Sequence, residues 1–100
     1  MKVTINKQNE KTLVTLEGSV DSTNAEQFQQ DIAPLMEGDS SDIDIDCTGM
    51  TYTSSQGLRV FLLLQKSVMA HQGTMVMRNM DSRVKEVFDI TGFSNIITIL

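Results

Sequence analysis

The sequence has very little of the residues that mark a special compartment. Among its 100 residues it has one cysteine, one proline and no tryptophan. A single cysteine forms no internal disulfide, so the fold does not depend on an oxidising compartment, and we expect a cytoplasmic protein. No apolar run approaches the roughly 18 residues of a membrane span, and the first residues lack the apolar core of a signal peptide. The sequence therefore predicts no direct membrane insertion.

Positive charge is also scarce. The chain has 8 Lys and Arg residues against 13 Asp and Glu, a net charge of −5, and its basic residues are scattered along the sequence. Nucleic-acid-binding proteins usually gather such residues into a patch or stripe, so we expect a protein partner and no nucleic acid. With 40% apolar residues and no low-complexity segment, residues 1–100 are expected to form one globular domain.

The residue patterns of standalone catalysis are missing as well. A phosphate-binding P-loop needs a lysine after its last glycine, which Gly57 lacks. A hydrolase elbow needs glycines two residues before and after its serine, but Ser55 has Thr53 before it. The only histidine, His71, lies about four turns from Ser55 on the same predicted helix, too far to act as its base. We therefore predict a protein that is not an enzyme and uses no cofactor.

Hydrophobic periodicity predicts alternating strands and helices. Alternation of apolar and polar residues, or short apolar runs, favours strands, and apolar residues every three to four positions favour helices. The expected strands cover 2–7, 11–17, 42–46, 74–78 and 96–100. The expected helices run from 25 to between 32 and 36, from 56 to 71, and from 81 or 82 to just before Gly92. A polar loop is expected at 37–41.

This order, β-β-α-β-α-β-α-β, predicts an α/β fold. The two opening strands are close enough for an antiparallel hairpin, and the later strands alternate with helices, which favours parallel pairing through right-handed crossovers. Such crossovers place the helices mainly on one face of a mixed sheet.

Two of the predicted helices begin with capping signals. Thr23 and Glu26 have the spacing of a capping box for the first helix. Either Ser54 or Ser55 is able to cap the second. Both alternatives stay open at this stage.

Three carboxylates, Asp42, Asp44 and Asp46, alternate along the expected strand at 42–46. Counting from Asp42, the sixth and twelfth positions of a calcium loop are Cys47 and Thr53, where Gly and Glu are needed. We therefore expect no metal, and interpret Asp42 and Asp44 as a solvated strand face. Cys47 has no base or second ligand near it in sequence, so we expect it to pack in the core.

The segment 46–58 is rich in hydroxyl side chains and is expected to be a loop that leads into the second helix. A helix start favours a phosphate, because its first N–H groups are free and its dipole is positive there. The sequence thus places serine at a position where a cap and a phosphate are both stabilised.

The chain resembles the STAS domain family, and within it the small standalone anti-sigma factor antagonists. The similarity covers nearly the whole chain. Segment 16–22 is similar to the family's turn into its first helix, 46–48 to its aspartate and hydroxyl pair, 52–58 to its Tyr-Ile-Asp-Ser-Ser-Gly-Leu signature, and 84–93 to its third helix and exit turn.

The resemblance implies a phosphorylation switch. Ser55 stands at the family's phosphorylated serine, and Ser54, which replaces the family's aspartate, is a second candidate; Gln56 replaces a small hydroxyl residue. The implied partners are an anti-sigma factor that is also a serine kinase of the GHKL type, bound only by the unphosphorylated form, and a phosphatase. Binding would release a sigma factor for transcription. The expected partner-binding residues are Asp21, Ser22, Asp46, Thr48, Tyr52, Thr53, Ser54, Gln56, Gly57 and Arg59, with Asp21 and Asp46 at strand ends and Arg59 placed to pair with the phosphate.

An alternative function belongs to a different class. Similar short STAS proteins sit on the ATPase subunits of ABC-type lipid transport systems, where the same surface would contact an ATPase constitutively. Nucleotide binding has no phosphate-binding signature in this chain to support it.

Overall fold

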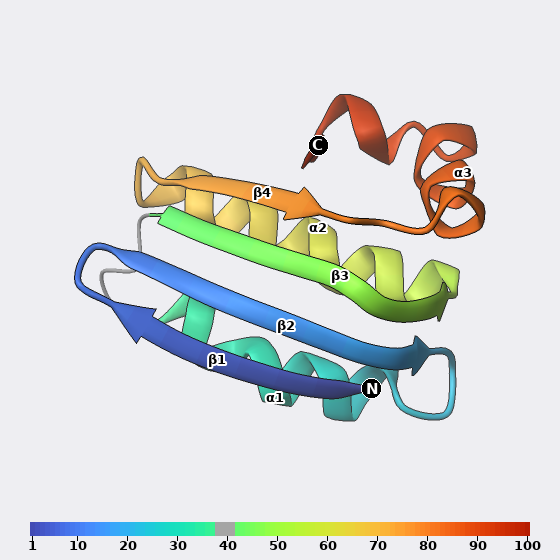
Figure 1. Cartoon of the computed structure of the whole chain (residues 1–100), viewed down its shortest axis with the longest axis horizontal. Helices are drawn as coiled ribbons and strands as arrows, with labels where there is room; N and C mark the ends of the chain where they lie inside the picture. The colour runs from blue at the N-terminus through green and yellow to red at the C-terminus, as the bar shows by residue number, and fades with distance from the viewer. Residues whose placement is uncertain (38–41) are drawn as a thin grey trace.

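A mixed sheet forms one layer of the molecule, and two long helices pack along its length (Figure 1). The computed structural model describes residues 1–37 and 42–100. The strands are β1 (Lys2–Gln8), β2 (Lys11–Val20), β3 (Asp42–Thr53), β4 (Thr74–Arg78) and β5 (Thr98–Ile99), and the helices are α1 (Ala25–Met36), α2 (Ser55–Ala70) and α3 (Ser82–Ile90), with a 3₁₀ turn at Phe93–Asn95.

The sheet has the order β1-β2-β3-β4-β5, with β1 antiparallel to β2 and every later pair parallel. Helices α1 and α2 cover one face, and α3 lies beyond the carboxyl end of β4, beside the last part of β3 (Figure 1). The α/β fold, the element order and the opening hairpin predicted from the sequence are confirmed.

The core lies between the sheet and the helices. Ile43, Ile45 and Cys47 of β3 point into it and are at most 1% exposed. Three phenylalanines connect the helices: the ring of Phe61 in α2 lies 5.3 Å from that of Phe28 in α1 and 5.8 Å from that of Phe88 in α3. Contacts between aromatic rings at these separations add to the stabilisation from burial and fix all three helices to one another.

The other face of the sheet is polar. Asp44 accepts from Arg78 at 2.8 Å and lies 3.5 Å from Lys11, while Asp42 accepts from the hydroxyl of Thr74. Asp42 is exposed, as expected for a solvated strand face, whereas the side chain of Asp44 is only 12% exposed because Arg78 and Lys11 cover it. Within 1–37 and 42–100, no group of acidic, histidine or cysteine residues is arranged to hold a metal ion. In the same residues no helix is long and apolar enough to cross a membrane.

Strand β3 is longer than the sequence suggested. The prediction of a loop after position 46 is wrong, because β3 continues to Thr53. Its pairing with β2 shifts register twice, between Thr15 and Glu17 and between Gly18 and Ser19. Each shift is a bulge that gives β3 one extra residue. The bulges interrupt the alternation of apolar and polar side chains, so the sequence of this part of β3 does not show the two-residue period of a strand.

Two further expectations about element ends are corrected. The capping box of α1 does not form; instead Asn24 precedes the helix, accepts from the backbone N–H of Asp21 at 2.8 Å and donates to the carbonyl of Ser19 at 2.9 Å. The last strand is only Thr98–Ile99, because the chain first makes a 3₁₀ turn. Helix α1 ends at Met36, within the predicted range, and the predicted polar loop lies outside the described residues except for Glu37.

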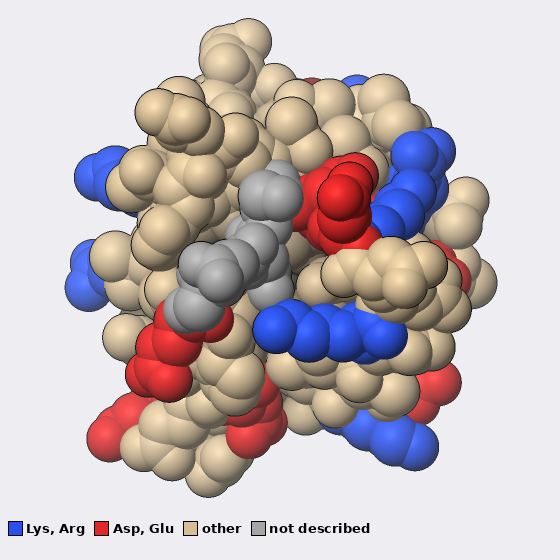
Figure 2. Space-filling view, turned by 90° about the vertical axis from the view of Figure 1, so that its left-hand side faces the viewer, with Lys and Arg blue, Asp and Glu red and all other residues tan. Residues whose placement is uncertain are grey.

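The end of the molecule with the β1–β2 turn and the α2–β4 turn has a mixed surface. Figure 2 shows this end, where Lys and Arg side chains are interspersed with acidic and neutral ones. The candidate site lies at the opposite end.

Candidate functional site

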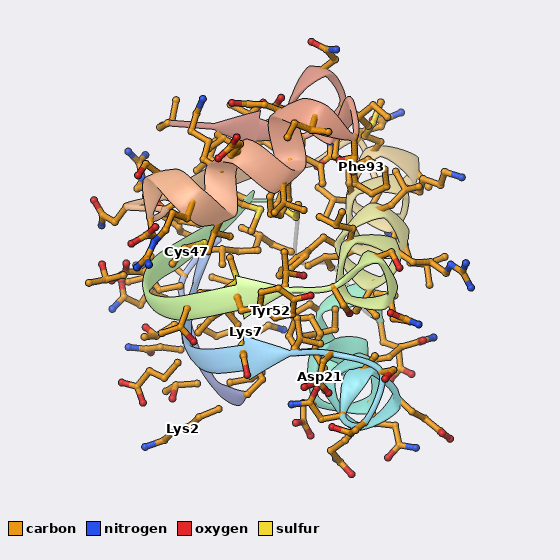
Figure 3. All side chains as sticks on the ribbon, turned by 90° about the vertical axis from the view of Figure 1, so that its right-hand side faces the viewer. Lys2, Lys7, Asp21, Cys47, Tyr52 and Phe93 are labelled. Carbon is orange, nitrogen blue, oxygen red and sulfur yellow. The ribbon has the colours of Figure 1, made fainter. Side chains whose placement is uncertain are left out.

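The carboxyl ends of β2 and β3 lie side by side and carry the two turns that lead into α1 and α2. Val20 of β2 pairs with Thr53 of β3, and the backbone N–H of Ser54 donates to the carbonyl of Val20 at 2.9 Å. This bond ties the Asp21 turn to the start of α2, and Figure 3 shows Asp21 and Tyr52 at this end. We call this region the Ser55 end. Parallel α/β sheets commonly place their functional residues at such carboxyl ends.

The structure separates the roles of the two serines. Ser54 is the N-cap of α2: its backbone is extended and its hydroxyl accepts from the N–H of Gly57 at 3.3 Å. Ser55 is the first helical residue and is exposed, and the one hydrogen bond described for its hydroxyl is a long contact of 3.4 Å to the side chain of Gln56. Ser54 therefore stabilises the helix start, while the hydroxyl of Ser55 is accessible.

Gly57 fixes how closely α2 approaches the sheet. A Cβ at this position would lie 2.5 Å from Cγ1 of Val20 and closer still to the hydroxyl of Thr53. Both Gly57 and Thr53 are buried. These two residues, expected among the partner-binding set, offer almost no surface to a partner; their contact positions the neighbouring serines.

Asp21 organises the other turn. Its carboxylate accepts from the hydroxyl and from the backbone N–H of Thr23, the latter at 2.8 Å. These hydrogen bonds lower the pKa of the Asp21 carboxyl below its ordinary value, and the bond from the Thr23 hydroxyl has the largest effect. Asp21 and the exposed Ser22 lie at the Ser55 end, as predicted.

Asp46 and Thr48 do not lie there, and the expectation that Asp46 ends a strand is wrong. Asp46 is in the middle of β3 on the polar face, paired with Arg78 of β4. Its carboxylate accepts hydrogen bonds from the hydroxyl and N–H of Thr48 and from the side chain of Asn79. These bonds lower the pKa of the Asp46 carboxyl below its ordinary value, and the bond from the Thr48 hydroxyl has the largest effect. Thr53 is seven positions further along, about 20 Å away on a bulged strand.

Two hollows flank the start of α2. One, of about 270 Å³, lies between α1 and α2; the other, of about 430 Å³, lies between β3 and α3. The first is lined by Ser22, Ala25, Glu26, Gln29, Gln56, Arg59 and Val60, and the second by Thr51, Tyr52, Thr53, Arg83, Val84 and Val87. Expected partner-binding residues therefore stand on both sides of Ser55.

The sequence did not indicate the contribution of α3 to this end. Arg83 and Val87 line the hollow beside Tyr52, whose side chain is 52% exposed. The spacing of Val84 and Val87 showed that they share one helix face, but no local pattern says which strand end that face meets. Strand β4 runs parallel to β3 and ends opposite Asp46, so α3, which follows β4, lies beside the remaining part of β3 that carries Tyr52.

In the described residues, His71 and Cys47 do not form a catalytic group with Ser55. His71 lies at the far end of α2, with its Nδ1 2.8 Å from the carbonyl of Ser67, so it cannot activate the Ser55 hydroxyl. Cys47 is buried, and this burial is the main reason that the pKa of its thiol is raised to about 12, which leaves the thiol unreactive.

The fold and this end define a small α/β domain with an accessible serine between two surface hollows. The chain belongs to the STAS domain family, whose model matches residues 2–100.

Its similarity to individual proteins covers most of the chain. It is 35% identical over 99% of its length to the putative anti-sigma factor antagonist BtrV of Bordetella bronchiseptica, covering 85% of that protein. It is 34% identical over 93% of its length to the anti-sigma-B factor antagonist of Bacillus subtilis, again covering 85%.

A solved protein shares the fold at lower identity. The anti-sigma factor antagonist SpoIIAA matches in its unphosphorylated form at a TM-score of 0.81 and 19% identity, over 99% of this chain and 88% of that one. Its phosphorylated form, from Bacillus, matches at 0.73 and 18%, over 99% and 91%.

Proposed function

We propose that this protein is an anti-sigma factor antagonist controlled by phosphorylation of Ser55. In the unphosphorylated state it binds an anti-sigma factor, which is also a serine kinase of the GHKL type, and so releases a sigma factor for transcription. Phosphorylation by that kinase ends the binding, and a phosphatase restores it. The protein acts by binding and not by catalysis.

The observation that carries this proposal is that Ser54 caps α2 while Ser55 is exposed. Because Ser54 provides the cap, the hydroxyl of Ser55 is exposed and accessible to a kinase. It also lies between the two hollows, at the end of the molecule that carries Asp21 and Tyr52 (Figure 3). The names of the two curated relatives, each at least 34% identical to this chain, support the same function.

A phosphate on Ser55 would act by occlusion. It adds about −1.5 to −2 charges and three acceptor oxygens. The folded domain tolerates these at a helix start, but a phosphate inside a desolvated interface must lose its water and meets partner carboxylates with repulsion. A penalty of about 4 kcal/mol weakens binding roughly a thousandfold. No refolding is needed.

The proposal is tested on the protein isolated from its native cells, growing and starved. We expect an intact mass with one phosphate in one condition, localised to Ser55, and a GHKL-type kinase that co-purifies only with the unmodified form. A protein that carries no phosphate in either condition and binds an ABC-type ATPase throughout contradicts the switch and supports the transport alternative.

A matched pair of variants tests the choice of serine. With the co-purified kinase and ATP, Ser55→Ala should accept no phosphate, whereas Ser54→Ala should still be phosphorylated, since its neighbour keeps the accessible hydroxyl. Phosphate transfer to Ser55→Ala and none to Ser54→Ala would reverse the assignment.

A further inference from the structure

Arg59 is an exposed cation one helical turn beyond Ser55. Its side chain makes no ion pair among the residues 1–37 and 42–100, where five other pairs are formed. It lines the hollow between α1 and α2 together with Gln56. A guanidinium left in solvent at this place is free to bind an anion with two parallel hydrogen bonds.

The helix geometry brings Arg59 toward Ser55. The two residues are separated by four positions, so they lie on the same face with a rise of about 6 Å along the axis. Side chains of a helix lean toward its N-terminus, which directs Arg59 back over the turn that carries Ser55. An acidic group four residues before a basic one is the favourable order for such a pair.

The other charged groups nearby come from three elements. Glu26 of α1 lines the same hollow, Asp21 lies on the adjoining turn, and Arg83 of α3 lines the hollow on the other side. Glu26 and Asp21 repel a phosphate on Ser55. Arg59 is thus the cation that shares both a helix face and a hollow rim with this end of α2.

We propose that Arg59 is the intramolecular counterion of phosphorylated Ser55. The phosphate is held at the rim of the α1–α2 hollow, next to Gln56, and Arg59 is no longer available to a partner. Phosphorylation then changes the interface at two points: it adds an anion at Ser55 and withdraws a cation at Arg59. The inference rests on the proposed function for the existence of the phosphate and deepens its regulation.

The test uses the full chain with phosphoserine incorporated at position 55 during synthesis, so no kinase is required. The phosphate is titrated by ³¹P NMR. Its second pKa, about 6 when unperturbed, should be about 0.15 to 0.4 unit higher in Arg59→Gln than in the unsubstituted phosphoprotein, as expected for loss of an i, i+4 pair. Arg59→Lys, which keeps the charge, should lie between the two.

Lys66→Gln is the matched control. Lys66 is exposed on α2 seven residues after Arg59, so the variant loses the same charge from the same helix at about 16 Å along the axis from Ser55. We expect no change in the pKa of the phosphate there. Equal pKa values in Arg59→Gln and the unsubstituted phosphoprotein, or an equal rise in Lys66→Gln, would overturn the pair. Either result is independent of whether cells phosphorylate Ser55, so it does not bear on the proposed function.

Discussion

Two adjacent serines have different tasks at the start of α2, and their contributions to stability should differ accordingly. The hydroxyl of Ser54 satisfies the N–H of Gly57, which has no partner within the helix. We predict that Ser54→Ala lowers the free energy of unfolding by about 1 kcal/mol. Ser55→Ala should change it by less than about 0.5 kcal/mol, because the exposed hydroxyl caps nothing. Urea denaturation of the two variants measures the difference, and equal losses would contradict the assignment of the cap.

Gly57 sets the position of these serines by the absence of a side chain. We predict that Gly57→Ala lowers the free energy of unfolding by roughly 1 to 3 kcal/mol, since the added methyl overlaps Val20 and Thr53. The exposed neighbour Gln56 provides the control: Gln56→Ala should stay within about 0.5 kcal/mol of the unsubstituted protein. If Gly57→Ala proved as stable as the control, α2 would not be held against the sheet as described.

The stability of α2 should depend on the charge at its first turn. This turn contains no acidic residue, so the partial positive charge of the helix start is not compensated. We predict that Ser55→Asp raises the free energy of unfolding by about 0.3 to 1 kcal/mol. In the proposed function, the same change should weaken binding of the anti-sigma factor.

The opposite effects of Ser55→Asp on stability and on binding distinguish occlusion of the surface from loosening of α2. Denaturation gives the stability and calorimetric titration with the purified partner gives the affinity. If Ser55→Asp weakened binding and also destabilised the fold, the negative charge would act by loosening α2, and occlusion of a surface would be the wrong mechanism.

Periodicity is informative for elements with one buried stripe and fails where the backbone is irregular. The 3.6-residue pattern identified α1, α2 and α3 to within a few residues because each buries one face. In β3 the buried residues Cys47, Met50 and Thr53 are three apart, since two bulges interrupt the alternation. A bulge depends on the partner strand, which a local pattern does not contain, so residues 48–53 resembled a loop.

At the scale of the whole molecule, the candidate site is assembled by topology. Asp21 and Ser55 are 34 positions apart, yet both follow strands whose carboxyl ends pair. Parallel pairing made this neighbourhood predictable from the sequence. It did not make Asp46 predictable, because its place depends on where β3 ends. Nor did it make Arg83 predictable, because its place depends on how α3 packs beside the end of β3.

Hydrogen-bonded aspartates in the folded protein predict how its stability depends on pH. Hydrogen bonds to Asp21, Asp46 and Asp81 lower the pKa of each carboxyl below its ordinary value in the folded state. A lowered folded pKa means that the unfolded chain binds protons first as the pH falls. The stabilisation is therefore complete above about pH 5 and is lost as the pH falls through the folded values below about 4.

Asp46 allows this dependence to be tested away from the Ser55 end. Its bonds to Thr48 lie on the polar face of the sheet, where a change does not disturb α2. Urea denaturation between about pH 6 and pH 3 should show a smaller fall in the free energy of unfolding for Asp46→Asn than for the unsubstituted protein. Thr48→Val, which removes the hydroxyl that most lowers the pKa of Asp46, should flatten the fall in the same direction. If both variants lost stability as steeply as the unsubstituted protein, the acid sensitivity would arise from other carboxylates.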